Sequence, residues 1–145
     1  MFINVKKVHK NAQLPFRATQ GSAGADLFAC IDADVVVLPQ ERVLIPTGIA
    51  IELDSPEVGA FIFPRSSLST KFGISLANCV GVIDSDYRGE IKVPVINHSN
   101  ELYTIHNGER IAQMVILPVV LPTFTEADEL SETERADGGF GSTGK

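Results

Sequence analysis

Short apolar segments separated by polar turns run along most of this chain, and helical spacing is almost absent. The segments are rich in Val, Ile and Phe, and Gly, Pro, Asn and Asp stand between them. Such regular short segments are typical of an all-β sandwich or barrel. The sequence therefore predicts a jelly-roll-like β-barrel, with strands at residues 3–8, 26–31, 35–38, 42–45, 48–53, 60–63, 81–83, 91–96, 102–105 and 110–121.

One segment breaks this β pattern. Residues 66–73 begin with two serines, which can cap a helix start, and end with Gly73, which can end a helix. We expect one short helix there and none elsewhere. Proline fits strand edges and bends better than central ladder positions, and we expect this placement for Pro39, Pro46, Pro64, Pro94, Pro118 and Pro122.

The length and the charge distribution predict one domain with a charged tail. A chain of 145 residues, 44% hydrophobic and 21% charged, can bury a single core. The net charge is −6, of which five acids in residues 126–134 supply −5, so −1 remains for the rest. This balance argues against a general nucleic-acid binder. We expect a catalytic barrel at 1–125, an acidic linker at 126–134 and a glycine-rich arm at 135–145.

The cysteines and histidines narrow the compartment and the chemistry. Cys30 and Cys79 lie in apolar stretches, and the chain start lacks the order of a signal peptide, so we expect two buried free thiols in the cytoplasm. No apolar run is long enough to span a bilayer. The three histidines lack metal-ligand spacing, which argues against a zinc site.

Arg65, Ser66 and Ser67 stand between a predicted strand and the predicted helix. An arginine fork, two hydroxyls and helix N-terminal amides together form a good phosphate site. The same triplet also fits a simple helix cap with an exposed arginine. The triplet alone does not decide between these interpretations.

Asp84 follows directly on the apolar residues 81–83. A carboxylate projecting from a sheet end into a partly desolvated cleft can hold and deprotonate a water. If the strand continues, Asp86 shares a face with Asp84. If a turn begins there, the turn separates the two side chains. Tyr87 offers a flat ring for packing against a sugar. The alternative is an Asp-rich β-turn between two strands.

Two further polar residues lie in apolar surroundings. Alternation places Ile111 and Gln113 on one face of a strand, with Arg110, Ala112 and Met114 on the other. The amide of Gln113 needs hydrogen-bond partners, which are either a ligand or a neighbouring backbone. Asp26, at a predicted strand start, fits a turn residue or an outer-shell group near a metal.

The last eight residues combine four glycines with one aromatic ring, Phe140. Glycines let the backbone fold closely around a ligand and present N–H groups to phosphate oxygens, and the ring can cover a base. Residues 139–145 match most of the phosphate-loop pattern, although no helix follows them here. A disordered glycine-rich end is the alternative interpretation.

Five segments resemble, in order, the five motifs of the trimeric dUTP pyrophosphatase (dUTPase) family. These segments are residues 23–27, 64–73, 78–89, 108–114 and 135–144. The resemblance implies a jelly-roll subunit of a homotrimer with active sites at subunit interfaces. It also implies hydrolysis of dUTP to dUMP and pyrophosphate, with Mg²⁺ carried by the triphosphate.

The resemblance further implies a role for each matching residue. Asp84 is the general base that orients the attacking water, and Tyr87 packs on the deoxyribose. Asp26 acts at most through magnesium-bound waters. Uracil is read by Asn78, Gly81 and the backbone around Val82, Ile83 and Lys92. The phosphates are held by Arg65, Ser66, Ser67 and Gln113. An arm from another subunit closes the site with Phe140 over uracil and with Arg135, Gly141 and Ser142 on the phosphates.

Two other functions remain open at this stage. A dCTP deaminase resembles dUTPases in fold and in the Arg-Ser-Ser element. It usually has a glutamate in the strand that follows the segment matching residues 78–89. In this chain that strand, residues 92–96, contains no glutamate. A non-catalytic nucleotide-binding barrel is the other alternative, and it has no use for Asp84. One departure from the family pattern is Ala136, where glycine commonly follows the arm arginine.

Overall fold

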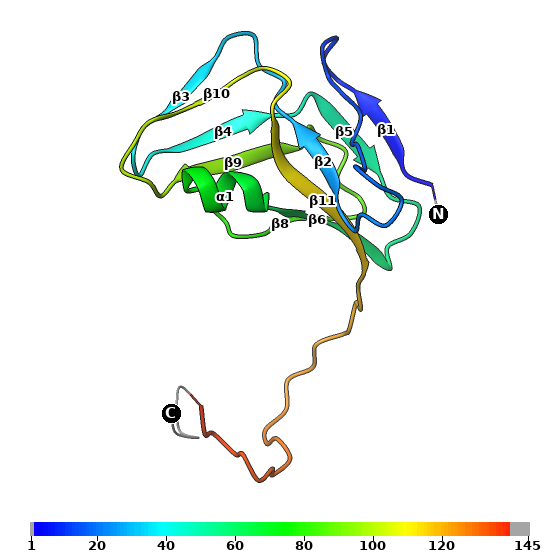
Figure 1. Ribbon diagram of the computed structural model, residues 1–145. Helices are drawn as coiled ribbons and strands as arrows, with labels where there is room; N and C mark the ends of the chain where they lie inside the picture. Colours follow the sequence, from blue (N-terminus) through cyan, green and yellow to red (C-terminus); the bar gives the residue numbers. More distant parts are fainter. Residues whose placement is uncertain (1, 140–145) are drawn as a thin grey trace.

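The computed structural model describes residues 2–139 and shows a β-barrel body with a long C-terminal arm (Figure 1). All strand pairs are antiparallel. The strands are β1 (Asn4–Lys7), β2 (Ala25–Phe28), β3 (Val35–Val37), β4 (Arg42–Pro46), β5 (Ile49–Glu52), β6 (Val58–Phe63), β7 (Ile74–Leu76), β8 (Gly81–Ile83), β9 (Lys92–Asn97), β10 (Tyr103–Ile105) and β11 (Arg110–Pro118).

Four small sheets enclose the core. The largest has the order β2-β11-β6-β8, a second has the order β4-β9-β7, and β1-β5 and β3-β10 form two-stranded sheets. Their inward faces bury aliphatic side chains such as Leu27, Ile45, Val93 and Ile105. Burial of this apolar area is the main stabilising contribution to the fold. The expected all-β jelly-roll-like class is confirmed.

The one expected helix is present as α1 (Ser66–Phe72). Gly73 ends it with φ 69, a left-handed conformation that glycine adopts without steric cost. Its first residues differ from the expectation, because Arg65 occupies the N-cap position and makes no side-chain capping bond. The serines do not cap the helix, so their hydroxyls stay exposed in its first turn.

Three other expectations were wrong. Residues 74–76 form β7, which was not predicted. Pro94 lies inside β9, the central strand of its sheet. Its carbonyl accepts a bond from Ala77 N at 2.7 Å, so the N–H that proline lacks would point just beyond the end of β7, where little pairing is lost. Cys79 is exposed in a turn, with φ 62.

Cys30 is buried and free, as expected. Burial, followed by the charges of Glu90 and Asp32, raises the pKa of its thiol. Within residues 2–139, α1 is too short to cross a bilayer, and no longer apolar helix occurs.

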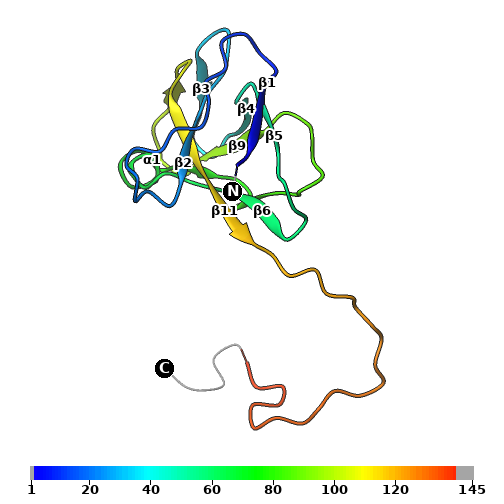
Figure 2. The same cartoon turned by 90° about the vertical axis from the view of Figure 1, so that its right-hand side faces the viewer.

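The chain leaves the barrel after β11. Val119 N still donates to Glu57 O at 2.8 Å, and from residue 120 the arm runs away from the body (Figures 1 and 2). Its large apolar side chains, Val120, Phe124 and Leu130, are about nine-tenths exposed, at 89%, 92% and 89%. The arm therefore makes little contact with its own barrel.

Candidate active site

Two cavities of the body collect most of the candidate residues, and they share none. The Asp84 cavity has a volume of about 390 Å³ and is lined by Leu44, Val82, Ile83, Asp84, Tyr87, Glu90, Ile91 and Lys92. The Arg65 cavity has a volume of about 330 Å³ and is lined by Ala18, Ser22, Ala23, Gly24, Asp26, Arg65, Ser66, Ser67, Arg110 and Gln113.

Asp84 lies where the edge strand β8 ends. A turn begins at Ser85, and Tyr87 N closes it with a bond to Asp84 O at 3.1 Å. Asp86 lies within this turn and so does not continue the strand, and it does not line the Asp84 cavity. The Asp84 carboxylate is exposed and has no side-chain partner among residues 2–139. One chain alone therefore does not form the desolvated cleft that we expected, but it leaves the carboxylate free to hold a water.

Tyr87 forms one wall of the Asp84 cavity. Its ring is 44% exposed, and its hydroxyl donates to Glu90 O at 3.1 Å. A Cβ atom at Gly89 would lie 2.3 Å from the Tyr87 oxygen, so glycine is needed there for this ring position. The result is a fixed flat surface beside Asp84.

Glu90 is a cavity residue that the sequence analysis missed. Its Oε1 accepts a bond from Gly48 N at 2.9 Å, and its Oε2 lies 3.7 Å from Lys92 Nζ. These partners come from separate elements, so no local pattern around Glu90 indicated the contact with Gly48. The second acid of the cavity is therefore already engaged, whereas Asp84 is not.

Asn78 and Gly81 lie outside the Asp84 cavity. Asn78 belongs to the turn between β7 and β8, and Gly81 is the first residue of β8, at the opposite end of this strand from Asp84. Val82, Ile83 and Lys92 do line the cavity with Asp84. The residues expected to read uracil therefore divide between the two ends of β8, which pairs with β6 and not with β7.

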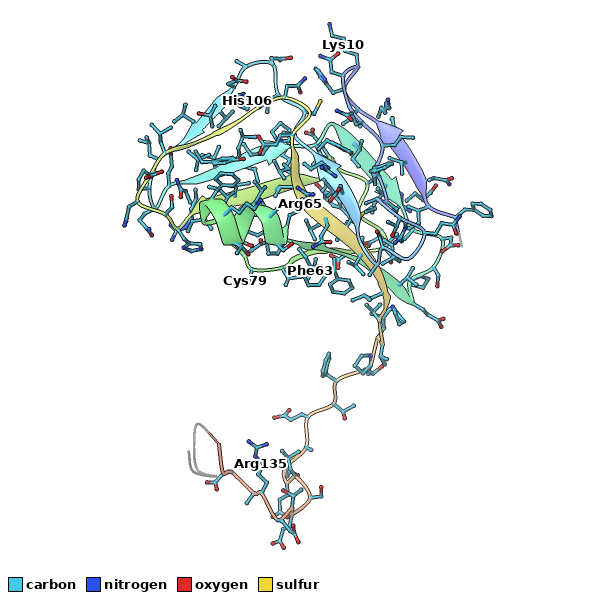
Figure 3. The ribbon with its side chains drawn as sticks, in the orientation of Figure 1. Lys10, Phe63, Arg65, Cys79, His106 and Arg135 are labelled. Atoms are coloured by element: carbon cyan, nitrogen blue, oxygen red, sulfur yellow. The ribbon has the colours of Figure 1, made fainter. Side chains whose placement is uncertain are left out.

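Asp26 is the centre of the Arg65 cavity. Its carboxylate, 13% exposed, accepts Arg65 Nε at 2.8 Å and Arg110 NH1 at 3.2 Å. Asp26 lies within β2 and is not a turn residue. Two guanidinium groups against one carboxylate leave this cluster with one positive charge, so the cavity suits an anion. Figure 3 labels Arg65 among the side chains of this part of the barrel.

A β-bulge brings Arg110 and Gln113 into the same cavity. The register of β11 against β2 shifts between Arg110 and Ala112. The expected alternation, with Arg110 and Gln113 on opposite faces, is therefore wrong, because the extra residue changes the phase. Gln113 Nε2 donates to Pro64 O at 3.0 Å, which is the backbone partner considered above.

The arm residues that the structure describes, 135–139, line neither cavity of their own chain. Arg135 lies near the far end of the arm, away from the barrel that carries Arg65 (Figure 3). Its Nε donates to Gly138 O at 2.9 Å, and Ala136 has φ 43. Phe140, Gly141 and Ser142 lie outside the described residues.

The chemistry of the two cavities is complementary. The Arg65 cavity presents cationic groups, two exposed serine hydroxyls and an amide, which are phosphate ligands. The Asp84 cavity presents a free carboxylate, a flat ring and the outer edge of β8, which pairs with β6 on its other side. Brought together in one site, groups of these two kinds can bind a phosphorylated planar ligand and place a water against it.

Comparisons with known proteins agree with this chemistry. The family model described as dUTPase matches residues 10–144. The deoxyuridine 5'-triphosphate nucleotidohydrolase of Hydrogenobaculum sp. is 57% identical over 145 residues, covering 99% of each chain. The protein of the same name from Desulfitobacterium hafniense is 56% identical over 135 residues, covering 93% of this chain and 89% of the relative.

Solved structures show the same architecture. The dUTPase of Staphylococcus bacteriophage 80alpha with dUPNHPP superposes with a TM-score of 0.89 at 29% identity, covering 99% of each chain. A mutant dUTPase from phage phi11 of S. aureus, described with a structural Mg(II) ion, has a TM-score of 0.81 at 23% identity, covering 91% of this chain and 100% of its own.

Proposed function

Because this chain belongs to the dUTPase family, we propose that it hydrolyses dUTP to dUMP and pyrophosphate at a site assembled from its two kinds of cavity. The observation that supports a shared site most directly is the separation of the two cavities. The free carboxylate and the phosphate ligands lie in different cavities of one chain. A site that contains both is completed when the Asp84 cavity of one chain faces the Arg65 cavity of another. The function limits uracil incorporation into DNA and supplies dUMP.

We propose Asp84 as the general base. A carboxylate without a protein partner can accept a proton from a water and orient that water toward the α-phosphorus. Displacement at phosphorus depends mainly on in-line positioning and on neutralised oxygens. Arg65, Ser66, Ser67 and Gln113 would supply these contacts from the partner's cavity.

The nucleoside would occupy the Asp84 cavity. The outer edge of β8 offers backbone donors and acceptors for uracil, and mismatched cytosine would leave them unpaired. The ring of Tyr87, fixed by Glu90 O, would pack on the deoxyribose and leave no room for a 2′-hydroxyl. Asn78 and Gly81, at the other end of β8, would complete the uracil slot.

The arm would close the site in a neighbouring chain. Its exposed apolar residues and its path away from its own barrel support action on another subunit. Arg135, Gly141 and Ser142 would contact phosphates, and Phe140 would cover uracil, which excludes water as a lid does.

The donor set of the Arg65 cavity fits Mg²⁺ bound through the substrate. Within residues 2–139 no cluster of three His, Cys, Asp or Glu residues is placed to hold a metal. Mg²⁺ is commonly held by phosphate oxygens and waters with one or two carboxylates. Both oxygens of Asp26 already accept arginine bonds, so Asp26 would contact only magnesium-bound waters. When bound, the ion would neutralise phosphate charge.

We propose a homotrimer in the cytoplasm. Exposed apolar side chains on the body, such as Leu44 at 57% and Val82 at 61%, support burial against another copy. Cys30 and Cys79 form no disulfide, which suits a reducing compartment.

A substrate panel tests the proposed function. Pyrophosphate release is measured with dUTP, dTTP, dCTP and UTP, and we expect it from dUTP alone. Ammonia is measured with dCTP in parallel, because Glu90 places an acid in the nucleoside cavity. Ammonia release would favour the deaminase, and binding of dUTP without pyrophosphate release would favour the non-catalytic barrel.

A further inference from the structure

The loop of residues 17–25 forms one rim of the Arg65 cavity. A two-way bridge closes its base, with Phe16 N to Asp26 O at 3.1 Å and Asp26 N to Phe16 O at 2.7 Å. A turn shapes its tip, where Ser22 N donates to Thr19 O at 3.2 Å. The loop therefore has a defined path over the cavity.

Arg17 braces this loop from one side. Its NH1 donates to the carbonyl oxygens of both Ser22 and Ala23, the latter at 2.9 Å. Arg17 itself does not line the Arg65 cavity, whereas Ser22, Ala23 and Gly24 do. The two carbonyls thus point toward Arg17.

This arrangement fixes the direction of two peptide N–H groups. In a trans peptide the N–H points opposite to the carbonyl of the same peptide unit. The N–H groups of Ala23 and Gly24 therefore point away from Arg17, and both residues line the cavity. Within residues 2–139 neither group donates to another protein atom.

Gly24 connects the loop to the rest of the cavity. A Cβ atom at this position would lie 2.6 Å from Gln113 Oε1, so the peptide lies directly against that side chain. Gln113 is held in turn by Pro64 O. Gly24 thus lies beside Gln113, and Ala23 and Gly24 both line the cavity that carries Arg65 and Arg110.

We infer that the N–H groups of Ala23 and Gly24 form an anion site for a phosphate oxygen of the triphosphate, and that Arg17 is the residue that positions them. Peptide N–H groups without protein partners are strong donors to phosphate oxygens. This inference rests on the proposed function only for the identity of the ligand. The site serves the pyrophosphate portion, because the nucleoside belongs to the Asp84 cavity.

Arg17→Ala and Ala23→Pro test this site in the full-length protein. The first removes the brace, and the second removes one donor. We expect each to raise the KM for dUTP about 10- to 100-fold, the factor given by one lost charge-assisted hydrogen bond. Inhibition by pyrophosphate should weaken similarly, and inhibition by dUMP should change less than about threefold. Arg17→Lys, which keeps a donor, should recover part of the loss.

Lys10→Ala is the matched control, since it removes one positive charge from the same exposed N-terminal segment. If Lys10→Ala raised the KM for dUTP as much as Arg17→Ala, the effect of Arg17 would come from its positive charge alone. That result would overturn the inference. Equal weakening of dUMP and pyrophosphate, or a lower melting temperature with unchanged KM, would overturn it too. Pyrophosphate binding measured by calorimetry needs no turnover, so this test separates the inference from a failure of the proposed reaction.

Discussion

Asp26 and Asp84 stand at opposite edges of one antiparallel sheet. Asp26 lies on β2 and Asp84 follows β8 in the order β2-β11-β6-β8. Three strand spacings separate them by about 14 Å across the sheet, and their registers add about 14 Å along it. At this separation, one nucleotide does not contact both cavities of the same chain at once. The proposed shared site can therefore be tested by combining two different variants.

Mixed assemblies of two inactive variants should regain activity. An Asp84→Asn chain retains a complete Arg65 cavity, and an Arg65→Ala chain retains Asp84. After unfolding and refolding of an equal mixture, random assembly gives about a quarter of the sites one intact cavity of each kind. Recovered dUTP hydrolysis near that fraction is the expected result. Refolding each variant alone is the control, and an inactive mixture would mean that each chain carries its own complete site.

Asp84→Asn should abolish hydrolysis and preserve binding. The amide is nearly isosteric with the carboxylate but cannot accept a proton from water, and general-base catalysis contributes typically ~10²–10⁴-fold. Turnover is measured by pyrophosphate release, and affinity by calorimetry with a non-hydrolysable dUTP analogue. Asp86→Asn is the matched control, because Asp86 is an acid of the same turn that does not line the Asp84 cavity. Full turnover in Asp84→Asn would exclude this base.

Truncation after Glu134 should leave a folded barrel with little turnover. The last backbone bond between the described arm and the body is made by Val119, so removal of residues 135–145 leaves the core intact. Circular dichroism and thermal melting should match the full chain within a few degrees, about the shift of a surface change. Unchanged turnover would show that the arm is not a lid.

Gly24→Ala should affect activity more than stability. The added methyl would meet Gln113 Oε1 at 2.6 Å, and the flexible Gln113 side chain can swing away. The lost bond to Pro64 O costs about 1 kcal/mol of unfolding free energy. The KM for dUTP should rise by about tenfold, because Gln113 no longer faces the phosphates. Gly21→Ala is the control, since nothing lies within 4 Å of its added atom.

Ionisation of Tyr103 should lower the free energy of unfolding in alkaline solution. Burial, and then the hydrogen bond to Glu109 and its charge, raise the pKa of Tyr103 above its ordinary value of 10.0. A raised folded pKa means that this stability is fully present below about pH 10 and is lost as the pH rises further. In urea unfolding from about pH 9 to about pH 11, Tyr103→Phe should therefore show a flatter decline than the unchanged protein. An equal slope in both proteins would contradict this coupling.

Local patterns carried most of the fold and the outline of the site. Alternating apolar residues and turn residues predicted every strand except β7, which follows Gly73 directly and is three residues long. The placement expected for Pro94 was wrong because a proline in a strand costs a hydrogen bond only where its nitrogen faces a paired neighbour. Which neighbour Pro94 faces depends on where β7 ends. The exposed position of Cys79 depends likewise on a turn with positive φ.

The long-range contacts of the site were beyond sequence reasoning. Asp26 meets Arg65 and Arg110, which are 39 and 84 residues away. The bulge in β11 changes which of its side chains share a face. No residue type among residues 110–112 indicates that a bulge occurs there. Arg110 and Glu90 therefore emerged as cavity residues only once the strands were paired.

The separation of the two cavities also has a consequence for how the enzyme behaves on dilution. If the site is shared as proposed, a subunit that leaves its partners keeps both of its half-sites but has no complete catalytic centre. Specific activity should then depend on total protein concentration, falling wherever mass action favours free subunits. Nucleotide that bridges two chains would oppose that loss, so substrate itself would help to hold the assembly together.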